Sequence, residues 1–390
     1  MASPIPARRV DLDWLRIAAF GLLIFYHIGM FYVTWGFHVK SSRASETIEP
    51  LMLLSNPWRL TLLFLISGVA TRFMFDKMSP GAFVGSRMGR LLPPLVFGIF
   101  VIVPPQTYFQ IVEALNYSGS IPDFYLHYVT ASGHWRIDGE PLITPTWNHL
   151  WFVAYLIVYT LLIMGVGPLL KRLPAMLFRP LGSGPAIFVL PWIAMFAIRY
   201  LLDPVFPETH ALFNDWGAHA LYFSAFALGY AVAKHEAFFE TAQRWRWLTL
   251  GLALLGWCVW VGPRIVGWTP PPGAAADIVG VAAREGQAWF AILACIGFAR
   301  RHLRRDGPVR RYLTDAIFPF YIIHQTTIVA MGFYLDPLQL PLWLEASILV
   351  LSTIASCWIG YEIARRVGFL RPLFGLKPRP RAQQDVPQSA

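Results

Sequence analysis

Charged residues are scarce in this chain of 390 residues. Only 14% of its residues are Asp, Glu, Lys or Arg, whereas 56% are hydrophobic. A soluble domain carries about 25% charged residues, because it needs a charged surface to stay in solution. The deficit is too large to be explained by a big hydrophobic core, and it therefore excludes an ordinary soluble protein.

Cysteine is also scarce, and Cys258, Cys295 and Cys357 all fall within apolar runs. Their spacing matches neither a disulfide framework nor a metal site. We interpret them as small buried side chains, and we expect no metal and no permanently bound cofactor. Although the net charge is +10, the basic residues are scattered over short connections, so we expect no nucleic-acid partner.

The chain is rich in apolar runs of about 20 residues, each long enough to cross a hydrocarbon core about 30 Å thick. Helices satisfy every backbone hydrogen bond within such a segment, so we predict an all-α, polytopic transmembrane helical bundle whose surface contacts the lipid bilayer. We predict about ten helices, at residues 14 to 36, 53 to 74, 91 to 110, 149 to 170, 185 to 202, 215 to 233, 246 to 262, 277 to 299, 313 to 334 and 342 to 363.

The basic residues predict the orientation of this bundle. If the two termini lie on the same side of the membrane, 24 of the 32 Lys and Arg residues lie on that side. Positively charged short loops stay in the cytoplasm, so we predict that both termini are cytoplasmic. We expect a single membrane-embedded domain over residues 1–377 and a disordered cytoplasmic tail over residues 378–390, which are polar and rich in proline. The connection 111–148 is expected to form a partly ordered outer cap.

Ionisable side chains within apolar spans mark functional sites by default, because they are costly there. The first span holds Arg16 and His27, eleven residues and therefore roughly 16 Å apart on one helix face. Taken alone, Arg16 could snorkel to the interface beside Asp13, and His27 could hydrogen-bond between helices. Two more histidines accompany them, His149 in TWNHLWF and His324 in FPFYIIHQTT. Together these predict a polar cavity, in which a neutral imidazole is suited to remove a hydroxyl proton near pH 7.

Arginines at both ends of the predicted bundle are further candidates. Arg87 and Arg90 lie one helical turn apart in SRMGRLLPP. They are either ordinary positive-inside charges or an anion clamp, because guanidinium groups bind phosphate in a bidentate manner. Arg59 lies toward the outer side, where it would meet a carboxylate or a sugar. Ser67 begins a Ser-Gly pair that allows close helix packing. Trp151 either joins an interfacial aromatic belt or stacks on a sugar ring.

In order and position, these residues resemble the acyltransferase-3 family of bacterial integral membrane proteins and, within it, the branch that succinylates periplasmic glucans. The resemblance covers nearly the whole chain. It is carried by the motifs DLDWLRIAAFGLLIFYH, WGFHVK, LLFLISG, RMGRLLPPLVFG, HLWF, NDWGAHALYFSAFALGY and FYIIH. The family implies transfer of an acyl group from cytoplasmic acyl-CoA to a hydroxyl of an extracytoplasmic glycan or related acceptor. It also implies a location in the bacterial cytoplasmic (inner) membrane.

The resemblance implies that Arg16 and His27 are catalytic, with His27 as general base or acyl carrier. It places Arg87 and Arg90, and we expect Ser67 with them, near the acyl donor, acetyl-CoA or succinyl-CoA. Because no hydrolase-like domain follows the last span, we expect any second transfer step to need a separate periplasmic protein. The residues expected on the acceptor side, to hold the hydroxyl or stabilise the oxyanion, are His149, Trp151, His324, Tyr321 and Arg59.

The alternative is a transporter or exporter of a glycan or small anion, in which buried His and Arg residues serve as a relay or gate. Many such transporters show an internal repeat and paired helices broken by Gly or Pro, and this sequence shows neither. A membrane scaffold without a substrate is disfavoured, because it leaves three histidines within the membrane unexplained. The sequence leaves open the acyl group, the acceptor, the oligomeric state, and the roles of Arg199, Arg284 and Glu285.

Overall fold

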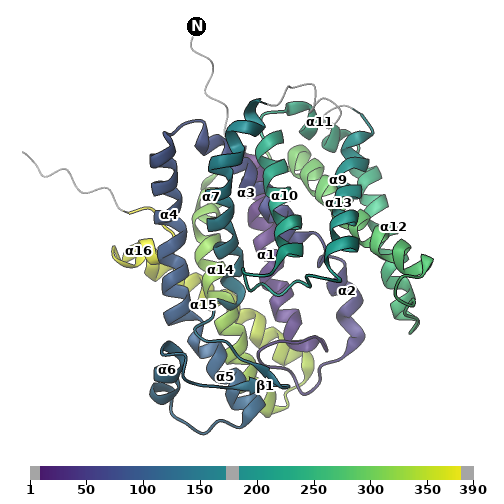
Figure 1. The fold of residues 1–390 in the computed structure, drawn as a ribbon. Coiled ribbons are helices and arrows are strands. Elements are labelled where there is room, and N and C mark those ends of the chain that lie inside the picture. The colour runs from purple at the N-terminus through teal and green to yellow at the C-terminus, as the bar shows by residue number, and fades with distance from the viewer. Residues whose placement is uncertain (1–8, 173–183, 379–390) are drawn as a thin grey trace, which may run out of the picture.

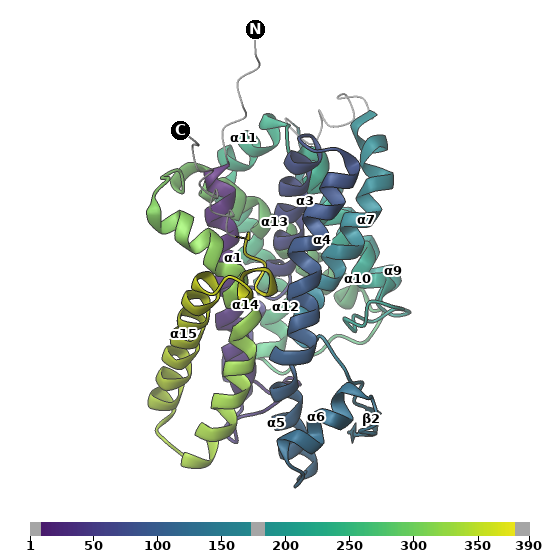
Figure 2. The same cartoon turned by 90° about the vertical axis from the view of Figure 1, so that its left-hand side faces the viewer.

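The computed structural model describes residues 9–172 and 184–378, and most of these residues are helical. Figure 1 and Figure 2 show long helices packed side by side, with short elements gathered at the end opposite the N-terminus. Within the described residues, seven helical stretches are long and apolar enough to cross a membrane. The chain is therefore an all-α, multi-pass membrane protein, as the sequence predicts. The predicted tail lies, apart from Pro378, outside the described residues.

The described elements follow one another along the chain with short connections. The helices are α1 (Val10–Tyr32), α2 (Glu49–Leu53), α3 (Arg59–Phe75), α4 (Pro80–Phe97), α5 (Pro104–Leu115), α6 (Ile121–Val129), α7 (Trp151–Arg172), α9 (Ala186–Leu202), α10 (Trp216–Val232), α11 (Glu236–Arg244), α12 (Arg246–Ile265), α13 (Ala275–His302), α14 (Pro308–Leu335), α15 (Leu342–Arg366) and α16 (Leu370–Leu373). The two strands, β1 (Arg136–Ile137) and β2 (Glu140–Pro141), form an antiparallel hairpin. Short 3-10 turns occupy Glu46–Ile48, Asn148–Leu150 and Asp336–Leu338, and a π-helical segment occupies Gly98–Ile102.

Each of the ten predicted spans coincides with a helix, but the boundaries of the third are wrong. The span predicted at 91 to 110 belongs to one helical stretch from Pro80 to Leu115, in which α4 continues through the π-helical segment into α5. Ser79 begins this stretch, because its hydroxyl accepts a hydrogen bond from the backbone N–H of Ala82. The arginines of the first turns lower the local hydropathy, so the hydrophobic pattern alone starts the helix too late.

The second predicted span, 53 to 74, also begins too early. Helix α3 begins at Arg59, after a turn that contains Pro57. The residue before a proline is biased away from helical backbone, which explains the break between α2 and α3. The connection 111–148, expected to be a partly ordered cap, contains α6 and the β hairpin.

Helices α3, α9 and α10 have 17 residues each and are shorter than the other predicted spans. At 1.5 Å per residue they are about 25 Å long, less than a hydrocarbon core about 30 Å thick. Most residues of α3 and α10 are buried within the protein. These two helices are surrounded by protein rather than lipid, so their length need not match the full thickness of the bilayer.

Helices α3 and α10 approach each other closely because each presents a glycine. A Cβ atom added to Gly68 would lie 1.9 Å from the carbonyl oxygen of Phe226. A Cβ atom added to Gly229 would lie 2.0 Å from the carbonyl oxygen of Leu65. The two backbones are therefore in direct contact, which is the close packing that the Ser-Gly pair of α3 allows.

We expect Gly229→Leu to destabilise the bundle, because a side chain at this position would push α3 and α10 apart. Overpacking of this kind costs about 1–3 kcal/mol or more, so the melting temperature in detergent should fall clearly. Gly251→Leu on α12 is the matched control, because nothing lies within 4 Å of its added Cβ. Equal melting temperatures for the two variants would show that the α3–α10 contact is not tight.

Candidate active site

Two of the predicted histidines meet inside the bundle. His27 on α1 and His324 on α14 lie with Nδ1 of His27 2.7 Å from Nε2 of His324. Their rings are nearly parallel, at an angle of 18°, with centroids 5.0 Å apart. The side chain of His324 is fully buried. The structure thus joins two histidines from opposite ends of the sequence into one hydrogen-bonded imidazole pair.

The backbone around His324 decides which ring nitrogens carry protons. Nδ1 of His324 lies 2.7 Å from the carbonyl oxygen of Tyr321, which can only accept a hydrogen bond. With both rings neutral, this hydrogen-bond network assigns the proton of His324 to Nδ1 and its lone pair to Nε2. His27 then donates from Nδ1, and the lone pair on its own Nε2 is left over. This is the tautomer that a general base requires.

His149 belongs to the same cluster, but protein groups contact both of its ring nitrogens. Its Nε2 lies 3.1 Å from the carbonyl oxygen of Ile322, and its Nδ1 lies 3.4 Å from the amide nitrogen of Gln106. The hydroxyl of Tyr321 donates to the backbone carbonyl of His149. The rings of His149 and Tyr321 lie 5.1 Å and 5.9 Å from that of His324. Both residues therefore support the histidine pair from one side.

Gln106 is a polar residue of this cluster that the sequence reading missed. It is fully buried, its amide donates to Thr326 at 2.7 Å, and its carbonyl accepts from Asn148 at 3.0 Å and Gln325 at 3.1 Å. An amide inside the apolar run after Pro105 was the available signal. Among residues 9–172 and 184–378, no group of three or more His, Cys, Asp or Glu side chains is arranged to hold a metal ion.

A cavity of about 740 Å³ lies in the half of the bundle where α1 begins. Four residues predicted from the sequence line this cavity together, namely Arg16 on α1, Ser67 on α3, and Arg87 and Arg90 on α4. Six basic and two acidic side chains face it in all. The basic ones are Arg16, Arg87, Arg90, Arg311, Arg371 and Lys377, and the acidic ones are Asp13 and Asp315. A cavity with this excess of positive charge is suited to bind a polyanion.

A layer of aromatic rings separates this cavity from the histidine pair. Phe20, one helical turn beyond Arg16 on the way to His27, lines the cavity together with Phe152. The ring centroid of Phe20 lies 5.3 Å from that of Tyr321 and 6.0 Å from that of Phe152. Tyr321 in turn precedes His324 by one turn of α14. The three rings of Phe20, Phe152 and Tyr321 form what we call the aromatic layer.

Arg59 and Trp151, predicted on the acceptor side, are both buried. The guanidinium of Arg59 lies 3.4 Å from the ring centroid of Tyr26 and donates to the carbonyl oxygen of Asn56 at 3.2 Å. The ring of Trp151 stacks on that of His210 at a centroid distance of 4.0 Å and is only 7% exposed. Trp151 therefore presents no open ring face to a sugar in this structure.

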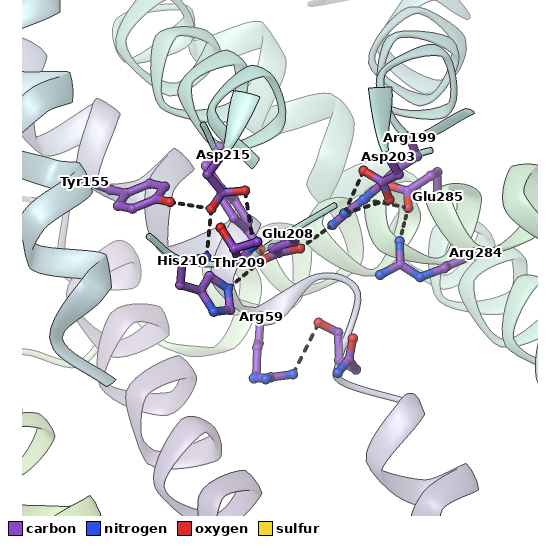
Figure 3. Close-up of polar contacts among 12 residues, drawn as sticks. Arg59, Tyr155, Arg199, Asp203, Glu208, Thr209, His210, Asp215, Arg284 and Glu285 are labelled. Carbon is purple, nitrogen blue, oxygen red and sulfur yellow. Dashed lines mark hydrogen bonds and ion pairs between the residues drawn. The ribbon is translucent and has the colours of Figure 1, made fainter. Parts of the chain in front are cut away.

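A buried charge network lies where α9 and α13 meet the loop between α9 and α10 (Figure 3). Arg199 at the end of α9 pairs with Asp203 and Glu208, both at 3.1 Å, and with Glu285 of α13 at 3.5 Å. Arg284 pairs with the same Glu285. The sequence left the roles of Arg199, Arg284 and Glu285 open, and the structure shows that they tie the two helices to the loop.

Asp215 holds the other half of this loop (Figure 3). Its carboxylate accepts hydrogen bonds from the backbone N–H groups of Thr209 at 3.3 Å and His210 at 2.9 Å, and from the hydroxyl of Tyr155 on α7. His210 also contacts Glu208, with Nε2 2.8 Å from the carboxylate. The loop is therefore fixed to α7 as well as to α9 and α13.

We expect Glu208→Gln to lower the stability of the protein at pH 7. Burial alone would raise the pKa of Glu208, but the hydrogen bond from His210 and the charge of Arg199 outweigh it and hold this pKa well below its usual range. Such a carboxylate stabilises the folded state above its unfolded pKa, about 4.3, and loses this effect as the pH falls through the folded pKa. The loss in the variant should be about 1–3 kcal/mol of unfolding free energy.

Thermal unfolding of both proteins in detergent, measured from pH 7 downward, checks this expectation. The difference should persist to pH 4 and shrink only below it, where the wild-type carboxylate takes up its proton. Glu140→Gln on the exposed β2 strand serves as the control. A difference that is already lost at pH 5 would contradict the assigned network.

The chain is similar to known proteins over almost its whole length. Residues 9–362 match the model of the acyltransferase-3 family, which is described as an acyltransferase domain. The chain is 23% identical to glucans biosynthesis protein C of Escherichia coli O139:H28 (strain E24377A / ETEC), over 98% of each chain. The same values hold for the proteins of that name from Escherichia coli K12 and Shigella dysenteriae serotype 1. No solved structure is significantly similar to it. Because the family model covers most of the chain, this protein belongs to the acyltransferase-3 family of membrane acyltransferases.

Proposed function

We propose that this protein is a membrane O-acyltransferase that moves an acetyl or succinyl group from acyl-CoA to a hydroxyl of an extracytoplasmic glycan or related acceptor. The observation that carries the proposal is the basic cavity, which ends one aromatic layer away from the hydrogen-bonded pair of His27 and His324. Family membership supports the reaction, and the name of the relatives, glucans biosynthesis protein C, supports a glycan acceptor.

The orientation in this proposal has both termini in the cytoplasm and the chain in the inner membrane of a bacterium. The distribution of Lys and Arg supports it, since 24 of the 32 lie on the side of the termini. The basic cavity then opens toward the cytoplasm, where acyl-CoA is present. The loop between α9 and α10 and the β hairpin then lie on the acceptor side.

The donor binds in the basic cavity with its phosphates near Arg16, Arg87 and Arg90. Guanidinium groups are suited to this role because they bind phosphate oxygens in a bidentate manner. The pantetheine arm extends along α1 past Phe20 toward His27, which is roughly 16 Å from Arg16 along the helix. The aromatic layer must therefore part to admit the thioester, and in the closed arrangement it keeps water from the histidine pair.

His27 acts as the general base in this mechanism. Its Nε2 takes the proton of the acceptor hydroxyl while the hydroxyl oxygen attacks the carbonyl carbon of the thioester. The new C–O bond forms, the C–S bond breaks, and the thiolate of CoA leaves and takes up the proton from His27. His324 accepts a hydrogen bond from Nδ1 of His27 throughout, and so stabilises the protonated ring. His149 and Tyr321 hold His324 in place.

A donor-release assay tests the proposed reaction. Purified full-length protein is incubated with acetyl-CoA or succinyl-CoA, and the free thiol of CoA is followed with and without a glucan acceptor. The proposal requires thiol release that depends on the acceptor, and the preferred donor identifies the acyl group. Acceptor transport without any thiol release would instead support a transporter.

We expect His27→Ala to abolish transfer while leaving the protein folded. General base catalysis contributes about 10² to 10⁴ in rate, so activity should fall by at least this factor. The same thiol-release assay measures the loss, and the melting temperature confirms the fold. His127→Ala on the exposed face of α6 is the control and should keep wild-type activity. Near-normal transfer by His27→Ala would sink the mechanism.

We also expect substitutions of His324 to separate its positioning effect from a packing effect. His324→Leu removes the acceptor for Nδ1 of His27, so the wrong tautomer and orientation should lower kcat about 10²-fold with little change in KM for the donor. His324→Gln keeps a carbonyl oxygen in reach of that N–H and should restore part of kcat. Equal kcat values for the two variants would show that His324 only fills space.

A further inference from the structure

The segment that follows α15 folds back against the bundle instead of leaving it. Residues 367–378, which include α16, form what we call the C-terminal strap. Figure 2 shows α16 lying between α15 and α4. Sequence reasoning treated the charges of this segment only as markers of orientation. Its position next to the arginine pair of α4 raises the question of what it does there.

Three consecutive residues fix the strap to the bundle. The ring of Phe374 packs on that of Phe97, with centroids 5.4 Å apart. Gly375 has φ +69°, the left-handed region that favours glycine, and a Cβ atom there would lie 2.6 Å from the ring of Phe318 on α14. Leu376 is buried at 8% exposure. These contacts hold a defined path for the chain rather than a loose end.

Arg371 fixes the shape of the strap from within. Its Nε donates to the carbonyl oxygen of Lys377 at 2.7 Å, and its Nη1 donates to that of Arg365 at 2.7 Å. The backbone N–H of Leu376 donates to the carbonyl oxygen of Arg371 at 2.8 Å. Both ends of the strap are therefore joined, and Lys377 is brought back toward the bundle at its exposed edge.

The strap forms one wall of the basic cavity. Arg371, Gly375, Leu376, Lys377 and Pro378 all line the cavity of about 740 Å³. Other walls come from α1, α4 and α14, which supply the remaining basic side chains. Lys377 and Pro378 are exposed, whereas the aromatic side chains that line the cavity toward His27 are buried. The strap therefore stands at the solvent side of the cavity, far from the histidine pair.

We propose that the C-terminal strap is part of the acyl-donor site, where Lys377 and Arg371 bind the phosphates at the nucleotide end of CoA. This inference rests on the proposed function. CoA carries a diphosphate and a 3′-phosphate, with about four negative charges near pH 7. The cavity offers six basic against two acidic side chains, and two of the six come from the strap. Arginines of α4 alone would hold only one side of such an anion.

The test is binding of coenzyme A itself to full-length protein in detergent, measured by titration calorimetry, together with KM and kcat for the donor. Lys377→Glu should weaken CoA binding and raise KM by about tenfold to a hundredfold, because a charge-assisted contact is lost and a repulsion added. Its kcat should stay near the wild-type value, since the strap is remote from His27. Lys377→Ala should show a smaller change in the same direction.

Arg301→Glu is the matched control, because this exposed arginine at the end of α13 carries the same charge change but does not line the cavity. It should leave CoA binding nearly unchanged. Wild-type affinity in Lys377→Glu, or an equal loss in Arg301→Glu, would overturn the role of the strap while leaving the proposed function intact. Failure of the wild-type protein to bind CoA would instead remove the proposed function and this inference together.

Discussion

The hydrogen bond between His27 and His324 requires α1 and α14 to lie side by side at one depth in the bundle. Each imidazole is a polar group in an apolar interior, where an unsatisfied donor or acceptor is costly. The carbonyl of Tyr321 fixes the proton on His324, and His324 fixes the proton on His27. The same contacts that satisfy these buried groups therefore leave one nitrogen of His27 in the form a base needs. Stability and reactivity have a single physical origin here.

The two halves of the bundle solve different electrostatic problems. Around Arg199 and Glu208, cations and carboxylates pair with each other and hold a loop in place. In the basic cavity, cations outnumber carboxylates, so positive charge remains for an outside anion. A network that neutralises itself is structural, whereas an excess of one sign is typical of a ligand site. This contrast, rather than the number of arginines, distinguishes the proposed donor site.

The aromatic layer explains how a path for a substrate crosses a membrane protein without becoming an open channel. Phe20, Phe152 and Tyr321 contribute rings from α1, α7 and α14, and their contact closes the cavity below the histidine pair. Apolar rings offer no partners to a chain of water molecules. In the proposed mechanism the donor and the acceptor then meet only at His27, which limits loss of the acyl group to water.

Much of the architecture is determined by the sequence alone, because each helix must satisfy its own backbone and bury or expose a continuous apolar run. The ten predicted spans all coincide with helices, and the early positions of Arg16, Arg87 and Arg90 were enough to expect an anion site. Helix boundaries were less certain, since Pro57 and the arginines of α4 disturb the hydrophobic pattern. The structure leaves the predicted roles of individual side chains as proposals.

Only the tertiary structure decided which side chains meet. His27 and His324 are 297 residues apart, and nothing local in either helix reveals their contact. The same holds for Gln106 beside His149, for the partners of Arg199, and for the strap that brings Lys377 to the cavity. The proton positions on the histidines also depend on a carbonyl whose direction is set by helix packing. Composition and periodicity determine a helix and its surface, but the chemistry depends on contacts between helices.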